Sequence, residues 1–407
     1  MFHATLLFLR CVIISLTMLV SLASFAESTS SASGGGRYDP PADDIDPARR
    51  AELLQDARTM RHQLGLDVSL GSKKSSEAFS IRTLSANSTR LLWPVRPGAD
   101  NRNDFQTGIS NYVDLNAAPN ALLDYACGAR TYDRSSGYNH DGIDIASWPY
   151  PWTVMDENGL DVVAAAEGVI VAKTGNQADR SCSFDTDAAW NVIVLAHDDG
   201  KQTVYGHLKR NSLTSKGIGE RVVAGEFLGQ VGSSGISTGP HLHFELLDEN
   251  DNTLDPFAGA CGASDSHWCW QPEYNRPGIN AVTIGDAAPV IGSCDGSEVP
   301  GLASTFEPGQ TIYVTSFLVN QPQGEAANLE VIAPDGSVWI DSQFWTPPQR
   351  FNFCFWYRSF NAPAIPGRWR VRVTLGDDVR SKVLQSLSQS LMACYWLMSC
   401  LAVAQLG

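Results

Sequence analysis

The chain has 407 residues, 43% of them hydrophobic and 18% charged, which is the balance of a folded protein of two or three domains and excludes a disordered chain. The formal net charge of −15 argues against a nucleic-acid partner, because a phosphate backbone attracts a basic surface. Composition says nothing more about the substrate or ligand.

The first 26 residues have the pattern of a secretory signal peptide. Arg10 precedes an apolar run over 11–22, and the residues Ser-Phe-Ala at 24–26 form a small-x-small cleavage site. A retained membrane anchor is the alternative interpretation. Cleavage would leave a mature chain that begins near Glu27, and the protein is then expected to be exported to the periplasm or the cell exterior.

Residues 27–90 are predicted to form a polar linker with one helix. Asp46 is placed to cap that helix and Pro47 to occupy its first turn. Apolar residues follow in partial helical register at Leu53, Leu54, Met60 and Leu64. Two interpretations stay open, a simple linker helix and a pro-segment that covers a later active site.

Residues 91–256 are predicted to form a β-rich domain. Residues 191–208 indicate a hairpin with its turn at Asp199-Gly200. The stretch "GPHLHFEL" at 239–246 alternates like a strand with two different faces. One face would carry His241, His243 and Glu245, and the other would bury Leu242, Phe244 and Leu246.

The remaining chain is predicted to hold a second β-domain. Residues 257–287 are rich in Gly, Ala, Pro and Cys and are expected to form a crossing segment. Short alternating strands and an Asp335-Gly336 turn predict a small β-sandwich-like domain over 288–380. Residues 381–407 end in an apolar tail that could be a membrane anchor, a buried end of the sandwich or an abnormal terminus.

Six of the nine cysteines lie outside the expected signal peptide and tail, and an even number in an exported protein indicates disulfides. Proximity favours a Cys261–Cys269 pair. The domain division favours Cys127–Cys182 and Cys294–Cys354. No pair has CxxC spacing, so a cysteine-based zinc site is not expected.

Three segments supply candidate metal ligands. "YNHDGIDIA" contains His140 and Asp144, "VYGHLK" contains His207, and "GPHLHFEL" contains His241 and His243. Catalytic zinc typically takes three nitrogen or oxygen ligands and leaves a fourth position to water. Neutral imidazoles and one carboxylate suit zinc and acidify that water.

This order of motifs resembles the lysostaphin-type (LytM/β-lytic) zinc metallopeptidases. The matching pieces are the His-x-x-x-Asp of 140–144, the Tyr-Gly-His-Leu of 205–208 and the Ser-Thr-Gly-Pro-His-Leu-His-Phe-Glu of 237–245. The resemblance covers roughly 91–256. It implies a mainly β fold, with an antiparallel-sheet metallopeptidase domain of this type followed by the small β-sandwich-like domain.

Carried over residue by residue, the resemblance implies that His140, Asp144 and His243 bind one zinc ion. It makes His207 and His241 the unliganded pair beside the metal-bound water. One of them would act as general base, and either or both would stabilise the tetrahedral transition state.

Two further features lie near the candidate ligands in sequence. Glu245 lies on the metal-facing side by alternation and is expected to make at most a supporting contact, while Asp141 is expected to be a solvated loop residue. The aromatic residues Trp148, Tyr150 and Trp152 form either a packed loop or the wall of a substrate groove.

The resemblance implies an exported zinc endopeptidase that cuts peptide bonds in peptidoglycan cross-links or stem peptides, with glycine and alanine at the cut. The C-terminal domain would position the enzyme or bind the cell wall. The alternatives are a secreted protease that acts on Gly-rich proteins, a non-catalytic regulator of cell-wall hydrolases, and an adhesin. Membrane contact is expected only if the C-terminal tail is an anchor.

Overall fold

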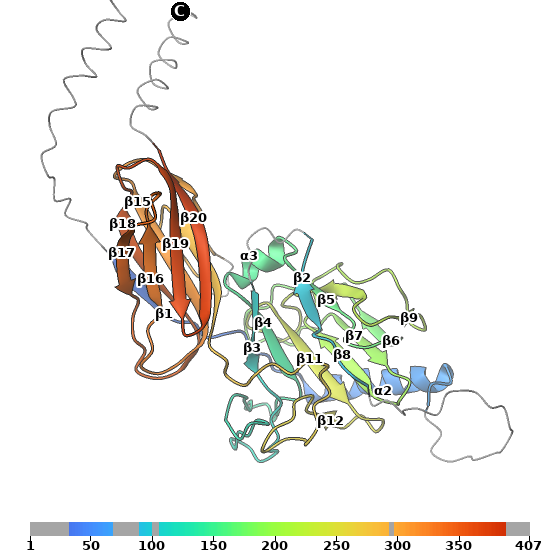
Figure 1. Cartoon of the computed structure of the whole chain (residues 1–407). Helices are drawn as coiled ribbons and strands as arrows, with labels where there is room; N and C mark the ends of the chain where they lie inside the picture. The colour runs from blue at the N-terminus through green and yellow to red at the C-terminus, as the bar shows by residue number, and fades with distance from the viewer. Residues whose placement is uncertain (1–31, 68–88, 100–105, 293–296, 388–407) are drawn as a thin grey trace, which may run out of the picture.

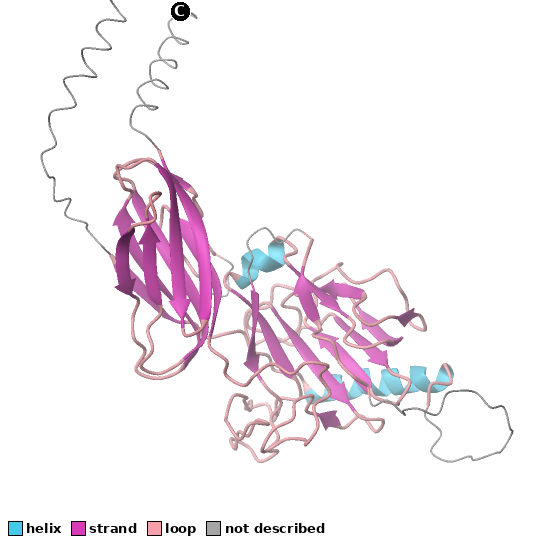
Figure 2. Ribbon diagram, viewed as in Figure 1, coloured by secondary structure: helices cyan, strands magenta, loops and turns pink. Residues whose placement is uncertain are grey.

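The computed structural model describes residues 32–67, 89–99, 106–292 and 297–387. The expected signal peptide and residues 388–407 of the expected tail lie outside these ranges. No helix in the described ranges has the length and apolar character needed to cross a membrane. The described chain is mainly β with nearly all strand pairs antiparallel, and a second β-domain follows the first, so the predicted fold class is confirmed (Figures 1 and 2).

The elements fall into an N-terminal segment, a large central domain and a C-terminal sandwich. Those of the N-terminal segment and the central domain are β1 (Ser33–Arg37), α2 (Pro47–Gln63), β2 (Val95–Pro97), β3 (Gln106–Asn111), β4 (Ile143–Trp148), α3 (Pro151–Asp156), β5 (Leu160–Val163), β6 (Gly168–Thr174), β7 (Val192–Ala196), β8 (Gln202–Gly206), β9 (Arg221–Val222), β10 (Phe227–Gln230), β11 (His241–Leu247) and β12 (Thr253–Leu254). Those of the sandwich are β13 (Gly278–Gly285), β14 (Thr305–Phe306), β15 (Thr311–Gln321), β16 (Asn328–Ile332), β17 (Val338–Gln343), β18 (Phe351–Asn361), β19 (Gly367–Leu375) and β20 (Asp378–Ser386).

The central domain is built on one large sheet with the order β3-β4-β11-β8-β7-β6-β9, and β12 pairs with β11. A small sheet of β10, β5 and β2 lies beside it. Strand β11 runs between β4 and β8, and its register sets His243 opposite both Asp144 and Gly206. The three motifs that are distant in sequence are therefore neighbours across three adjacent strands.

Strand β11 has the two faces that its sequence predicts. Its alternate residues Leu242, Phe244 and Leu246 are fully buried in the main core. The opposite face carries the histidines and Glu245 and then continues into an apolar patch at Leu247. Helix α2 covers that patch with Leu54, so the helix packs on the same face as the histidines.

The C-terminal domain is a sandwich of two sheets around its own core. One sheet has the order β1-β18-β15-β13 and the other β14-β20-β19-β16-β17. In β19 the alternation predicted from sequence is present, since Trp369, Val371 and Val373 are buried between arginines. Strand β13 lies within the stretch expected to be a crossing segment, and β20 extends beyond residue 380, so this domain uses more of the chain on both sides.

The N-terminal segment spans both domains (Figure 1). Its strand β1 pairs antiparallel with β18 and forms an edge of the sandwich. Helix α2 then begins where the sequence predicts, because the Asp46 side chain accepts hydrogen bonds from the backbone N–H groups of Ala48 and Arg49 and Pro47 occupies the first turn. The residues between β1 and α2 cross the central domain.

The predicted disulfide pairings are wrong. Cys261 is bonded to Cys127, because the chain after β12 folds back and the Cys261 N–H donates to the backbone carbonyl of Tyr125. Cys182 is also disulfide-bonded. Cys354 is a free thiol buried in β18, and Cys269 is free and exposed.

Candidate metal centre

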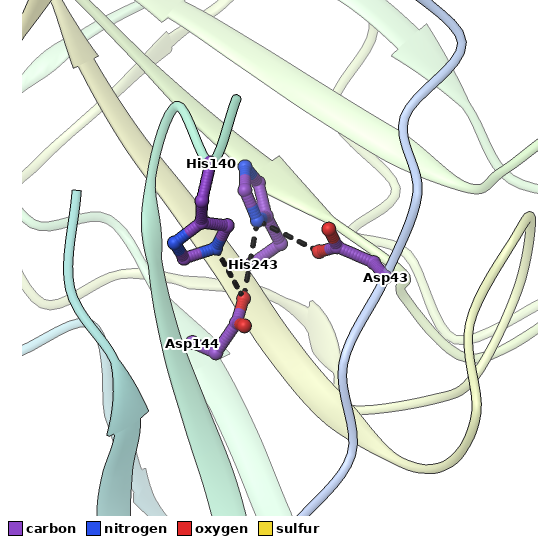
Figure 3. Close-up of side chains that lie close together, drawn as sticks. All are labelled: Asp43, His140, Asp144 and His243. Atoms are coloured by element: carbon purple, nitrogen blue, oxygen red, sulfur yellow. Dashed lines mark hydrogen bonds and ion pairs between the residues drawn. The ribbon is translucent and has the colours of Figure 1, made fainter. Parts of the chain in front are cut away.

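The three predicted ligands meet at one point (Figure 3). Asp144 on β4 lies opposite His243 on β11, and its Oδ1 is 3.2 Å from His243 Nδ1. His140 lies in the loop before β4, and its Nε2 is also 3.2 Å from Asp144 Oδ1. All three side chains are fully buried. The ligand atoms face one another as a metal site requires.

The orientation of His140 fits a metal ligand. Its Nδ1–H donates to the carbonyl oxygen of Tyr112 at 2.7 Å, which fixes the tautomer and leaves Nε2 with a free lone pair. This Nε2 is buried and has no hydrogen-bond partner within the described part of the chain. A buried nitrogen without a partner is costly unless a metal ion accepts its lone pair. Two imidazoles and a carboxylate are a donor set that suits zinc.

The two predicted catalytic histidines form a second pair beside this point. His207 follows β8 with a left-handed backbone, and His241 begins β11. Their ring centroids are 4.6 Å apart. His207 Nδ1 donates to the carbonyl of Ser234 at 2.6 Å, and His241 Nδ1 donates to the carbonyl of Gly239 at 2.9 Å. In the neutral tautomer that these bonds favour, both Nε2 atoms can accept a proton.

The residue that sequence reasoning missed is Asp43. It comes from the N-terminal segment, and Figure 3 shows its carboxylate reaching the ligands from the side opposite β4. Its Oδ2 lies 2.9 Å from His243 Nδ1, 3.0 Å from His207 Nε2 and 3.3 Å from His241 Nε2. Asp43 is fully buried, and one ligand atom from it and each of the three predicted ligands lie within 4.8 Å of one another. It therefore offers a fourth donor.

Backbone contacts hold Asp43 in this place. Its neighbour Ala42 exchanges hydrogen bonds with Thr238, and Asp44 N–H donates to the carbonyl of Ile236. The phenolic oxygen of Tyr132 donates to Asp43 Oδ1 at 2.6 Å. No sequence signal marks Asp43 among the acidic residues around it; only the pro-segment interpretation directs attention to this stretch.

A contact from helix α2 supports the site from behind. Glu245 Oε1 lies 3.4 Å from His243 Nε2, the ring nitrogen on the far side from the ligand cluster. Glu245 is itself paired with Arg50 of α2 at 2.5 Å. Asp141 is half-buried and lies 3.4 Å from Arg50, so it is not a freely solvated residue as expected.

The charges of the site stabilise one another. Burial alone would raise the pKa of Asp43, but the charge of His243 and hydrogen bonds from the histidines hold it well below its usual range. Burial would lower the pKa of His243, but the carboxylates of Asp43 and Asp144 raise it well above its usual value. Burial lowers the pKa of His207 despite its hydrogen bond to Asp43. The carboxylates are therefore ionised, as metal ligands must be.

The aromatic residues at the end of β4 and just after it do not line a groove. Trp148, Tyr150 and Trp152 are all buried, and the groove interpretation is wrong for the described form. Trp148 packs between Tyr38 and the sandwich residue Phe317, at ring-centroid distances of 4.4 and 5.6 Å. The loop is thus a packed junction between the N-terminal segment and the two domains.

Comparison with known proteins places this site in a family. The profile of peptidase family M23 matches residues 138–256, which include all five predicted site residues. The DD-carboxypeptidase/endopeptidase Mpg of Neisseria meningitidis is 38% identical over 106 residues, or 26% of this chain and 19% of that protein. The peptidoglycan DD-endopeptidase ShyC of Vibrio cholerae is 34% identical over 89 residues, or 22% of this chain and 18% of that protein. The glycyl-glycine endopeptidase ALE-1 of Staphylococcus capitis is 30% identical over 125 residues, or 30% of this chain and 29% of that protein.

The chain therefore spans less than a third of the length of these relatives. Among solved structures, the catalytic domain of lysostaphin from Staphylococcus simulans is 24% identical with a TM-score of 0.24, covering 40% of this chain and 96% of that one. A zinc-containing peptidase from Vibrio cholerae is 20% identical with a TM-score of 0.23, covering 42% of this chain and 39% of that one. The profile match and the sequence relatives lead to one conclusion: residues 138–256 of this chain are a peptidase family M23 domain.

Proposed function

We propose that the protein is an exported, zinc-dependent endopeptidase that hydrolyses peptide bonds in peptidoglycan cross-links or stem peptides. The observation that carries the proposal is the convergence of His140, Asp144 and His243 on one buried point beside the pair His207 and His241. The relatives named as peptidoglycan and glycyl-glycine endopeptidases support this substrate class. The expected signal peptide supports export.

The side chains divide the work of hydrolysis. His140 Nε2, an oxygen of Asp144 and His243 Nδ1 would hold zinc, which when bound polarises the scissile carbonyl and acidifies water. His207 and His241 present their Nε2 atoms to the same point, where one takes the proton of the attacking water and either can donate a hydrogen bond to the developing oxyanion. Their Nδ1 bonds to backbone carbonyls keep both rings in place during this exchange.

We further propose that the described form is latent and that residues 38–45 are an inhibitory part of a pro-segment. The carboxylate of Asp43 lies within 3.3 Å of three of the site histidines, in the space that substrate and water would need. Pro41 lies against Gly239, just before the histidines of β11. Substrate can reach the histidines only after this stretch moves.

The test uses the full mature chain and its Asp43→Ala variant, loaded with zinc and incubated with purified peptidoglycan, with and without a chelator. Release of soluble peptides that the chelator abolishes is the expected result. His241→Ala should keep about one zinc per chain and lose turnover, whereas His243→Ala should lose zinc. Equal zinc content in these two variants would contradict the assignment of ligand and catalytic roles.

A Gly-rich protein serves as the comparison substrate in the same assay. Cleavage of that protein at a higher rate than peptidoglycan would favour the secreted-protease alternative. Zinc binding without cleavage of either substrate by Asp43→Ala would favour the regulator. The presence of all three ligands and both partner histidines supports the enzyme over the regulator.

A further inference from the structure

The first turn of helix α2 lies beside the metal centre. It packs on the same sheet face as the histidines, and Leu54 and Ala57 bury its underside. Arg50 lies one turn before Leu54 and extends toward the strand β11 rather than toward solvent, with only 16% of its side chain exposed. An arginine so placed needs a buried anionic partner.

That partner is Glu245. Arg50 Nη2 donates to Glu245 Oε2 at 2.5 Å, and Arg50 Nε donates to the same oxygen at 3.1 Å. Arg50 Nη2 also donates to Thr253 Oγ1 at 3.2 Å, and Asp141 lies 3.4 Å from Nε. Because the guanidinium is planar and bound through two nitrogens, the Glu245 carboxylate is held in both position and orientation.

Glu245 and the backbone of Gly142 confine the His243 ring. The Nε2 edge lies 3.4 Å from Glu245 Oε1. On another side, a Cβ atom at Gly142 would come within 2.6 Å of His243 Nε2, so the glycine lets the backbone lie against the ring. His243 Nε2 has no hydrogen-bond partner within the described part of the chain, and the Glu245 carboxylate is the anion beside it, so the charge of Glu245 favours the proton of a neutral ring on Nε2 and its lone pair on Nδ1, the atom that faces the other ligands.

We propose that Arg50 is a positioning residue for the metal centre, acting through Glu245 on His243. The inference rests on the proposed function only in taking His243 as a zinc ligand. It divides the N-terminal segment into two parts with opposite effects, since Asp43 blocks the site while Arg50, seven positions later, supports it. Activation must then displace the stretch around Asp43 and leave α2 docked.

The experiment measures zinc affinity in the full mature chain by competition with a chromophoric chelator. Arg50→Met should weaken zinc binding about 10- to 100-fold, the usual effect of removing a group that orients a ligand. Arg50→Lys keeps the charge and should recover part of the loss. The matched control is Arg58→Met, which removes an ion pair between the same helix and Asp251, remote from the histidines. Arg58→Met should leave zinc affinity within about twofold of wild type.

Cobalt substitution adds a measurement that would not change if Arg50 only stabilised the fold. The visible absorption of bound cobalt should shift in Arg50→Met and stay unchanged in Arg58→Met, because only the former frees the His243 ring. Glu245→Gln gives the same test without touching the helix, should Arg50→Met reduce folding. Each variant is measured with Asp43 present and with Asp43→Ala, so that the extra donor does not mask the loss.

Equal zinc affinity and equal cobalt spectra in wild type, Arg50→Met and Glu245→Gln would overturn the inference. Its failure is distinguishable from failure of the proposed function. If no variant cleaves peptidoglycan but Arg50→Met still loses zinc affinity, the positioning role stands and the peptidase proposal falls. If cleavage is strong in wild type and Arg50→Met alike, the peptidase proposal stands and the positioning role falls.

Discussion

Replacing Asp43 with alanine should activate the enzyme, and the structure sets the size of the effect. Asp43 Oδ2 lies 3.0 Å from His207 Nε2 and 3.3 Å from His241 Nε2, where each ring donates a hydrogen bond to it when protonated, and it faces His243 Nδ1 at 2.9 Å. A hydrogen bond to a charged group contributes about 1.5–3 kcal/mol net. Two such bonds, discounted because the freed carboxylate regains water, stabilise the closed form by about 3 kcal/mol.

This free energy corresponds to about a 100-fold change in the ratio of open to closed molecules, since about 1.4 kcal/mol is a factor of ten. The assay is the initial rate of peptide release from purified peptidoglycan by zinc-loaded wild type and Asp43→Ala. The rate of the variant should rise by up to about two orders of magnitude. A matched control is Asp44→Ala, since Asp44 bonds Ser136 rather than any histidine and should change the rate by less than about threefold.

The outcome that refutes the reasoning is a rate for Asp43→Ala that equals the wild-type rate at equal zinc content. A lower rate together with a lower zinc content would also refute it, because Asp43 would then be a working ligand rather than an inhibitor. Zinc content is therefore measured on the same samples as the rate.

Two further predictions concern the closed form. Without metal, the carboxylates raise the folded-state pKa of His243 above its unfolded value of about 6.5, so its contribution is complete below that pH and is lost as the pH rises through the raised value. The melting temperature in chelator should fall as the pH rises above about 6.5, more steeply in wild type than in Asp43→Ala; parallel curves would contradict the assigned pairing. Gly35→Val should also raise the peptidase rate, because Gly35 has a φ of 138° and a Cβ there would collide with the carbonyl oxygen of Phe355, which prevents β1 from docking. An unchanged rate with β1 displaced would show that the strand does not hold the inhibitory stretch.

The local sequence pattern correctly predicted the two faces of β11 and the start of α2. The alternation of β11 placed its histidines and leucines on the correct faces, because a strand has a period of two residues. The N-cap at Asp46 and Pro47 located the start of α2. The five site residues were named from motif resemblance, and the antiparallel register of β4, β11 and β8 accounts for their proximity.

Contacts between residues far apart in the sequence could not be predicted from it. Asp43 meets His241 across 198 positions of sequence, and no period or cap marks it. Strand β1 is a run of glycines, which have low strand propensity, and it pairs only because β18 offers a free edge. The aromatic loop after β4 was open to two interpretations because its partners, Tyr38 and Phe317, come from opposite ends of the chain.

The pairing of β1 with β18 constrains the order in which the parts of the chain can fold. Ala32 and Ser359 are hydrogen-bonded although 327 positions separate them, so β1 can pair only after β18 has been synthesised. Loop closure over such a distance is slow compared with the folding of the central sheet. A chain that stops before β18 gives β1 no edge on which to dock, and its catalytic domain loses this restraint. Under the proposed latency, loss of the C-terminal sandwich by premature termination or proteolysis would therefore uncover the metal centre as well as remove a domain.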